Sequence, residues 1–396
     1  MSPLNPGSRG RRLPGSRIVH LTSVHPAFDV RIFHKECKSL AAAGYDVTII
    51  SPHDHDEIKD GVRVVAIAKP RNRRERVSRT VRAVYRAALR VDADVYHFHD
   101  PELMPVGMLL KLKGKHVIYD VHESYRDIAL SREWIPSLLR PVVSQVVRFA
   151  ESALASQFDH IIAAVPAISE SFPLHKTTVV HNFPEADFDV QGSAEPYKHR
   201  PAICVYAGGI SLKRGAREMV EAVGIVPAEF ECRLALAGNI EPALQVALRS
   251  VPGWARVDVL GWRSRQDVSL LLGRSRVGLC VLHPSPNHLH AFPIKLFEYM
   301  SAGLPVIASD FPLYREIVLD TQSGVVVNPQ NSLEIAEAIT WMLLHPNEAA
   351  QMGRNGQRAV AEKYNWATES SKLLAVYSKI RATKKGLISA ATVIGA

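Results

Sequence analysis

A lysine and a glutamate stand one helical turn apart in the segment 292–307, Phe-Pro-Ile-Lys-Leu-Phe-Glu-Tyr-Met-Ser-Ala-Gly-Leu-Pro-Val-Ile. On a helix, Lys295 and Glu298 share one face. An ammonium group binds phosphate, and a carboxylate accepts hydrogen bonds from the two hydroxyls of a ribose. The order of residues predicts a helix that begins near Pro293 and ends at Gly303, before a buried strand. The segment therefore predicts a pocket that binds both the phosphate and the ribose of a nucleotide.

A glycine-rich turn at 206–215 joins a predicted strand to a predicted helix and carries the basic pair Lys213-Arg214. Gly208 and Gly209 allow a ligand to approach the backbone closely, and the N–H groups at the start of a helix bind anions. Arg214 can add a bidentate contact to the same anion. The turn suits a diphosphate, although a glycine turn before a helix is common.

Two strand ends in the first half carry titratable clusters, His97-Phe98-His99-Asp100-Pro101-Glu102 and Tyr119-Asp120-Val121-His122-Glu123. Because ligands of open parallel sheets bind at the carboxyl ends of the strands, both clusters are candidates for acid–base chemistry or for binding sugar hydroxyls. The loop after the first strand carries Asp29 and Arg31 but lacks the Gly-x-Gly-x-x-Gly pattern of dinucleotide sites. An NAD-dependent dehydrogenase is therefore not expected.

Short β-rich runs alternate with helix-length segments throughout, which indicates an α/β fold with doubly wound parallel sheets. The strands predicted in the first half are 18–23, 47–51, 62–67, 95–99, 116–121, 160–165 and 178–181. Those predicted in the second half are 203–207, 233–237, 257–260, 277–282, 306–309 and 324–328. A helix is expected over 30–43, with Asp29 as its N-cap and Gly44 as its end.

The length of 396 residues predicts two domains. Their expected boundaries are a basic arm at 1–16, an N-terminal domain at 17–185, a linker at 186–200, a C-terminal domain at 201–366, a helix at 367–384 and a tail at 385–396. No apolar run is long enough to span a bilayer and no signal peptide is evident, so a cytoplasmic protein is expected. The four cysteines are far apart, which favours buried thiols over a zinc site.

The formal net charge of +9 is concentrated between Lys69 and Arg90, where nine basic residues face one acid, Glu75. Arg79, Arg82, Arg86 and Arg90 recur at helical spacing, and Val81, Val84, Tyr85 and Ala88 could form the inner face of the same helix. Such a face suits an anionic membrane surface or a phosphate-bearing acceptor, and a merely solvated face is the alternative. Nucleic acid is not expected, because only Tyr85 interleaves with the arginines.

With these motifs the sequence resembles the GT-B retaining glycosyltransferases, specifically family four of bacterial surface-polysaccharide enzymes. The resemblance covers 18–380. It rests on the turn that ends Lys213-Arg214-Gly215, the block from Lys295 to Gly303 with Pro305, the strand at 324–329, and Tyr364-Asn365-Trp366 before the last helix.

The resemblance implies two Rossmann-like domains that face each other across a cleft, with a final helix that returns to the first domain. It implies a nucleotide diphosphate sugar as donor, with Glu298 on the ribose, Arg214 on the diphosphate in place of a metal ion, and His122 near the transferred sugar. Lys295 is an added candidate for catalysis. The expected donor-binding residues are Gly208, Gly209, Arg214, Asn239, Gly261, His290, Ala291, Phe292, Lys295 and Glu298. The expected acceptor-side residues are Asp29, Arg31, His99, Asp100 and Glu123. No metal and no cofactor are expected.

The sequence departs from the family pattern at two positions. His290 stands where the family usually has a first glutamate, and Gly209 stands where an arginine is common. His290 could replace the glutamate by hydrogen bonding, or the backbone around Ala291 and Phe292 could bind the sugar. Alternatives to a working transferase are therefore a catalytically silent nucleotide-sugar-binding partner subunit and a sugar-nucleotide epimerase or phosphorylase of the same fold.

For the transferase, the expected reaction moves a hexose with retention of configuration to a polysaccharide or lipid-linked saccharide. UDP is favoured over GDP as the carrier. A lipid-linked acceptor together with the basic helix predicts peripheral association with the inner face of the plasma membrane.

Overall fold

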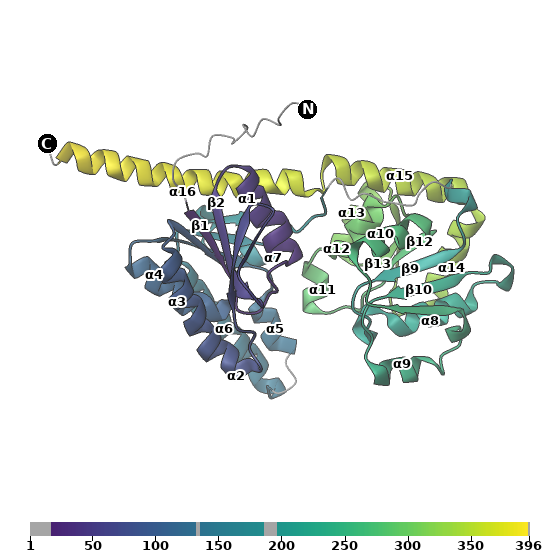
Figure 1. The fold of residues 1–396 in the computed structure, drawn as a ribbon. Coiled ribbons are helices and arrows are strands. Elements are labelled where there is room, and N and C mark those ends of the chain that lie inside the picture. The colour runs from purple at the N-terminus through teal and green to yellow at the C-terminus, as the bar shows by residue number, and fades with distance from the viewer. Residues whose placement is uncertain (1–16, 132–134, 186–195, 395–396) are drawn as a thin grey trace, which may run out of the picture. The chain divides into compact units, whose positions relative to one another are not determined.

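The computed structural model describes residues 17–131, 135–185 and 196–394. The predicted basic arm at 1–16 and most of the predicted linker lie outside the described residues. The chain forms two compact units, Met1–Asn182 with Glu369–Ala396, and Phe183–Thr368 (Figure 1).

The first unit contains an eight-stranded sheet of order β3-β4-β2-β1-β5-β6-β7-β8. All neighbouring strands are parallel except β3, which pairs antiparallel with β4 at the edge. The strands are β1 (Arg17–Leu21), β2 (Asp46–Pro52), β3 (Glu57–Lys59), β4 (Val62–Ile67), β5 (Val95–Phe98), β6 (His116–Val121), β7 (His160–Ala163) and β8 (Thr177–Val179). The predicted strands of this half are confirmed, and the short edge strand β3 was not predicted, since three residues are too few to show alternation.

The helices of this unit lie between the strands and on the returning C-terminal segment. They are η1 (Val30–Cys37), α1 (Lys38–Ala42), α2 (Arg73–Glu75), η2 (Arg76–Thr80), α3 (Val81–Val91), η3 (Pro101–Leu103), α4 (Met104–Leu112), α5 (Tyr125–Ser131), η4 (Ser137–Leu139), α6 (Arg140–Ala155), α7 (Pro166–Ser169), η5 (Leu174–Lys176) and α16 (Trp366–Ile394). Helix α16 continues to Ile394, beyond its expected end at 384, because the single Gly386 is not enough to end a helix.

The helix expected at 30–43 is present, and its two ends are as predicted. The Asp29 carboxylate accepts hydrogen bonds from the N–H groups of Arg31 and Ile32, and Gly44 follows with a positive φ of 89°. The first part, η1, is wound as a π-helix, which apolar periodicity alone does not distinguish from an α-helix.

The second unit contains a six-stranded, all-parallel sheet of order β11-β10-β9-β12-β13-β14. Its strands are β9 (Ile203–Ala207), β10 (Arg233–Ala237), β11 (Val257–Gly261), β12 (Val277–Cys280), β13 (Val306–Ser309) and β14 (Gly324–Val327). Its helices are η6 (Tyr197–His199), η7 (Leu212–Arg214), α8 (Ala216–Ile225), η8 (Ala228–Phe230), α9 (Pro242–Leu248), η9 (Trp254–Arg256), α10 (Arg265–Arg274), α11 (Pro286–His290), α12 (Ile294–Ser301), α13 (Pro312–Asp320), α14 (Ser332–Leu344) and α15 (Pro346–Glu362).

Alternating side chains of β9 divide the core of the second unit into two layers. Cys204 and Tyr206 point to one face, where they pack with residues of α8 and α14. Val205 and Ala207 point to the other face, where they pack with residues of α12 and α13. Both faces of the sheet are therefore covered by helices, which explains why its strands are mostly apolar.

Each sheet has one position at which the strand order reverses. In the first unit it lies between β1 and β5, and in the second between β9 and β12. Ligands of doubly wound folds bind at this switch point, beyond the carboxyl ends of the strands. The loops after these four strands are thus the first places to look for a site. Within the described residues, no helix is both long and apolar enough to cross a membrane.

Candidate functional site

In the second unit, the turns after β9 and β10 touch each other through their backbones. Gly208 N–H donates to the carbonyl of Ala237 over 2.8 Å, and Ile210 N–H donates to the carbonyl of Asn239 over 2.9 Å. A Cβ atom on Gly238 would come within 1.9 Å of the Gly208 carbonyl oxygen. Only glycine fits there, and the contact holds the Gly208-Gly209 turn in place.

The same glycine-rich turn is pressed against the end of β12. Gly215 has a φ of 73°, and a Cβ atom on it would come within 2.2 Å of the Val281 carbonyl oxygen. His283 N–H donates to the carbonyl of Lys213 over 2.9 Å. The loops at the switch point of this sheet are therefore one connected structure.

Two cationic side chains converge on the glycines of this turn. The Arg214 guanidinium donates from Nη1 to the carbonyl of Gly209 over 3.1 Å. The Lys295 ammonium lies 4.9 Å from the centre of the Tyr206 ring. A Cβ atom on Gly208 would lie 3.7 Å from Lys295 Nζ. The structure thus brings together Gly208, Gly209, Arg214 and Lys295, which the sequence predicted as one site.

The departure at Gly209 has a direct geometric reason. A Cβ atom at this position would lie 2.9 Å from Nη1 of Arg214. A larger residue would push the guanidinium away from the turn. Gly209 therefore leaves space that Arg214 occupies.

The charge of these two cations is felt by a neighbouring histidine on α11. His288 Nδ1 lies 2.8 Å from the His283 carbonyl oxygen. Burial lowers the pKa of His288, and the positive charges of Arg214 and Lys295 lower it further. The positive potential that disfavours a charged imidazolium at His288 also favours the binding of an anion near Arg214 and Lys295.

The remaining predicted donor-binding residues lie on other loops and helices of the second unit. Glu298 and Phe292 are half-buried, on and just before α12, whereas His290 and Asn239 are exposed. Gly261 has a positive φ of 69° with open space around its Cα. Ala291 ends α11, immediately before Phe292. The roles of these residues in donor binding stay predictions.

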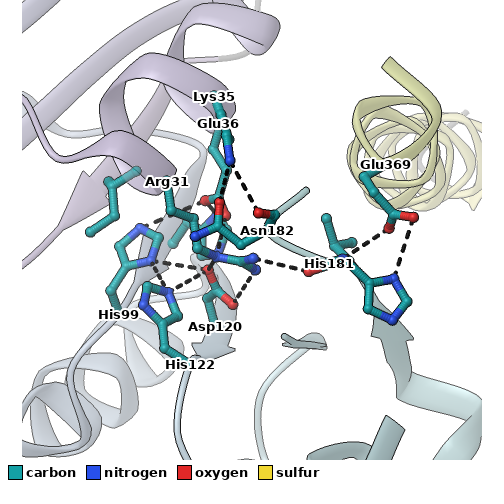
Figure 2. A network of polar contacts seen from close by, with 12 residues as sticks. Arg31, Lys35, Glu36, His99, Asp120, His122, His181, Asn182 and Glu369 are labelled. Carbon is teal, nitrogen blue, oxygen red and sulfur yellow. Dashed lines mark hydrogen bonds and ion pairs between the residues drawn. The ribbon is translucent and has the colours of Figure 1, made fainter. Parts of the chain in front are cut away.

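In the first unit, His122 follows the carboxyl end of β6, the strand next to β5, and is held by a buried carboxylate (Figure 2). Its Nε2 lies 2.8 Å from Asp120 Oδ2 and 3.2 Å from His99 Nδ1. The His122 side chain is 17% exposed, whereas Asp120 is fully buried. One end of the ring is thus fixed by the protein.

Asp120 in turn is held by Arg31. The guanidinium donates from Nε and Nη2 to the two carboxylate oxygens, over 3.2 and 3.0 Å, and from Nη1 to the carbonyl of Val180 over 2.9 Å. Burial would raise the pKa of Asp120, but Arg31 and His122 hold it well below its usual range. The ionised carboxylate is therefore available to orient His122.

Several residues predicted to face the acceptor are instead engaged within the protein. The Arg31 side chain is 4% exposed, and His99 and Asp100 are buried. Asp100 accepts hydrogen bonds from the Thr22 hydroxyl and the Ser23 N–H, and Asp29 caps η1. Of this group, Glu123 is exposed. Contact of the acceptor with these residues stays a prediction.

The sequence reasoning missed four partners of this network. They are His20 in β1, Glu36 in η1, Lys35, whose ammonium donates to Asn182 Oδ1 over 2.5 Å, and Tyr377 in α16, whose hydroxyl lies 2.8 Å from His97 Nδ1. A histidine inside an apolar strand and a Lys-Glu pair on the inner side of a helix were the available signals. The contact with Tyr377 spans most of the chain and leaves no local pattern.

The predicted basic helix is present as η2 and α3. Arg79, Arg82, Arg86 and Arg90 are exposed, and Val84 and Ala88 are buried as expected. Val81 and Tyr85 are only half-buried, because Ala87 and Thr80 take part of the inner face.

Two family models match the chain. "Glycosyl transferase 4-like domain" matches residues 30–182, and "Glycosyl transferases group 1" matches residues 189–359.

Individual relatives and structures agree with these matches. The chain is 23% identical to glycogen synthase of Mycobacterium tuberculosis, over 88% of this chain and 90% of that protein. It is 24% identical to the GDP-mannose:cellobiosyl-diphosphopolyprenol alpha-mannosyltransferase of Xanthomonas campestris, over 69% of this chain and 71% of that protein. Among solved structures, Anabaena HepE in complex with UDP and glucose has a TM-score of 0.69 at 16% identity, covering 92% of this chain and 100% of that one.

Proposed function

Because the chain belongs to the GT-B glycosyltransferases of family four, we propose that it moves a hexose from a nucleotide diphosphate sugar to a saccharide with retention of configuration. The observation that supports this best is the convergence of Arg214 and Lys295 on the glycine turn at the switch point of the second sheet. Two cations beside a glycine turn suit the diphosphate of such a donor.

In this proposal the diphosphate lies against Gly208 and Gly209, with Arg214 and Lys295 beside it. Glu298, half-buried on the same helix as Lys295, accepts hydrogen bonds from the ribose. The two cations neutralise the charge that grows on the diphosphate as the sugar leaves, which is the role that a divalent metal has in other transferases. The nucleotide is UDP in preference to GDP.

The first unit supplies His122 to the transferred sugar. The Asp120 carboxylate accepts from Nε2–H of the imidazole, which sets the ring orientation and its tautomer. For retention, the acceptor hydroxyl attacks from the face that the diphosphate leaves, and the departing diphosphate takes up the hydroxyl proton. The exposed His290 or the backbone around Ala291 and Phe292 contacts the sugar in place of the usual glutamate.

The direct test is turnover of purified protein with UDP-glucose, UDP-galactose and GDP-mannose, followed by proton NMR of the anomer that is first released. We expect slow release of nucleotide and hexose of unchanged configuration, with more UDP than GDP. Lys295→Gln should slow release, and Lys213→Gln, an exposed lysine of the same turn, should not. Release of the inverted anomer would refute retention, and no release from any donor, with or without saccharide acceptors, would favour the silent partner subunit.

We further propose a lipid-linked acceptor at an anionic membrane surface. The exposed arginines of η2 and α3 supply the charge that such a surface attracts. Helix α6 of the same unit exposes Val142, Val146 and Phe149, at 61, 62 and 80%. These residues recur at helical spacing, as in helices that lie in a membrane interface.

A further inference from the structure

A cluster of three histidines and one glutamate is buried beneath η1 in the first unit. His20 comes from β1, His97 from β5 and Glu36 from η1, and His99 follows β5. All four are between 0 and 2% exposed. His20 and His97 are paired across neighbouring strands, so their rings meet on one face of the sheet, with centres 4.5 Å apart.

One carboxylate oxygen of Glu36 points at all three rings. Glu36 Oε2 lies 3.8 Å from Nδ1 of His20, 4.0 Å from Nδ1 of His97 and 4.0 Å from Nε2 of His99. It has no hydrogen-bond partner within the described part of the chain. Burying a polar atom without a partner is costly, so something that binds an oxygen and imidazole nitrogens is expected among these four atoms.

The outer contacts of two of the three rings, His99 and His20, match those of metal-binding histidines. His99 presents Nε2 to the cluster, while its Nδ1 lies 3.2 Å from Asp120 Oδ2. His20 presents Nδ1, while its Nε2 lies 3.4 Å from the Tyr377 hydroxyl. Metal-bound histidines ordinarily donate their other ring N–H to a carboxylate or another acceptor, which fixes the tautomer. Arg31 Nε, 2.9 Å from Glu36 Oε1, holds the carboxylate from its other side.

We propose that His20, Glu36, His97 and His99 bind one divalent transition-metal ion, with Zn²⁺ as the ion that this set of ligands suits best. The four candidate ligand atoms all lie within 4.8 Å of one another. Around a tetrahedral zinc ion with bonds of about 2.1 Å, neighbouring ligands are about 3.4 Å apart. To reach this spacing, the Glu36 distances of 3.8 to 4.0 Å shorten by about half an ångström and the 2.9 Å contact of His20 with His99 lengthens by about as much.

Binding of the ion changes two hydrogen bonds. The contact of His20 Nδ1 with His99 Nε2, at 2.9 Å, is replaced by two bonds to the metal, and the Tyr377 hydroxyl turns from His97 Nδ1 towards His20 Nε2. Because four protein atoms complete the coordination, the ion is structural. It fastens η1 and, through Tyr377, α16 to the sheet, next to the contact of His99 with Asp120.

The test uses full-length protein without a histidine tag, in which His53→Ala and His55→Ala remove the half-exposed His53-His55-Glu57 group that could bind metal at the surface. Metal content is measured by mass spectrometry in the protein as purified and after refolding with ZnCl₂ or CoCl₂. We expect one ion per chain, and the absorption spectrum of tetrahedral Co²⁺ in the cobalt form.

In the same background, Glu36→Gln and His20→Gln should lose the ion, and His160→Gln, a buried histidine of β7 outside the cluster, should keep it. If the Glu36 and His20 variants do not fold, the stoichiometry and cobalt spectrum of the background protein decide alone. Absence of bound metal after both treatments, an octahedral cobalt spectrum, or retention of the ion by folded Glu36→Gln would overturn the proposal. None of these outcomes depends on transferase activity.

Discussion

At the scale of single residues, His122 is distinguished by how firmly its ring is held. Asp120 contacts Nε2 of His122, and Arg31 forms an ion pair with Asp120. A buried ion pair therefore orients the partly exposed imidazole. This arrangement is what a contact to a reacting sugar needs, because an oriented group does not have to reorganise during the reaction.

We predict that His122→Ala lowers kcat by about a hundredfold with a small change in KM, as expected when a preorganised contact of the transition state is lost. His175→Ala, an exposed histidine on η5, is the matched control and should leave both constants unchanged. Steady-state kinetics of nucleotide release provide the measurement. An unchanged kcat in His122→Ala would remove this residue from the site.

Glu151 on α6 makes stability depend on pH. It accepts a hydrogen bond from the Tyr119 hydroxyl over 2.7 Å, and burial raises its pKa from 4.5 to about 7. The folded state therefore holds a proton that the unfolded chain releases near 4.5, and stability falls as the pH rises from about 4.5 to 7. The shift corresponds to about 3 kcal/mol.

The check is urea unfolding between pH 4.5 and 7.5 for the protein and for Glu151→Gln. The difference in unfolding free energy between the two should change by about 2 to 3 kcal/mol in this range and then level off. Glu170→Gln, whose carboxyl is exposed, is the control. Parallel pH profiles for the protein and Glu151→Gln would contradict the assigned pKa.

The site residues could be predicted to the extent that their pattern is local. Gly208 and Arg214 follow a strand end, where ligands of parallel sheets bind, and they lie with Lys295 of α12 as expected. Arg31 and Asp100 also follow that rule, yet they point inwards, because a buried partner decides where a long polar side chain turns. Glu36 was missed for the same reason, since its environment is made by β1 and β5.

At the scale of elements, the docking of the glycine turn on the end of β12 positions Arg214. A side chain on Gly215 would meet the Val281 carbonyl oxygen at 2.2 Å, so the turn cannot keep this place with any other residue. Gly114 has nearly the same φ, 72° against 73°, but nothing lies within 4 Å of a Cβ atom there. Comparing alanine substitutions at Gly114 and Gly215 therefore separates the free-energy cost of backbone strain from the cost of the close contact with Val281.

We predict that Gly114→Ala costs about 1 kcal/mol of unfolding free energy through strain alone. Gly215→Ala should cost about 2 kcal/mol more, and should also weaken nucleotide binding, because the turn must move away from β12. Urea unfolding and nucleotide titration of both variants give the comparison. Equal losses of stability, with nucleotide binding intact, would show that the turn is not held as described.

Elements whose apolar residues recur with a clear helix or strand period were predicted well, and short or unusual elements were not. The strand β9 and the helix α12 were expected within a residue or two of their ends, because apolar runs between Gly and Pro mark them. The edge strand β3 is too short to show a pattern, and apolar periodicity does not distinguish the π-helical winding of η1 from an α-helix.

At the scale of the whole molecule, a basic face and an exposed apolar stripe in the first unit predict attachment to anionic lipid. Each arginine near such a surface contributes about 1 kcal/mol, so Arg79→Gln, Arg82→Gln and Arg86→Gln together should weaken binding to phosphatidylglycerol vesicles about a hundredfold. The control neutralises Arg249, Arg274 and Arg358, which are exposed in the second unit. If both triple variants sediment with the vesicles as much as the unmodified protein does, the result argues against a membrane-bound acceptor.

The claim that the second unit binds the donor is tested most directly by the melting temperature of the protein with UDP, GDP, ADP and dTDP. A ligand that binds only the folded state at a hundred times its Kd adds about 2.7 kcal/mol of stability. We predict that UDP raises the melting temperature most, that Glu298→Ala and Arg214→Gln lose the response, and that Glu337→Ala, exposed on α14, keeps it. If no nucleotide at millimolar concentration raises the melting temperature, or if Glu298→Ala and Arg214→Gln respond like the unmodified protein, the proposed donor site is wrong.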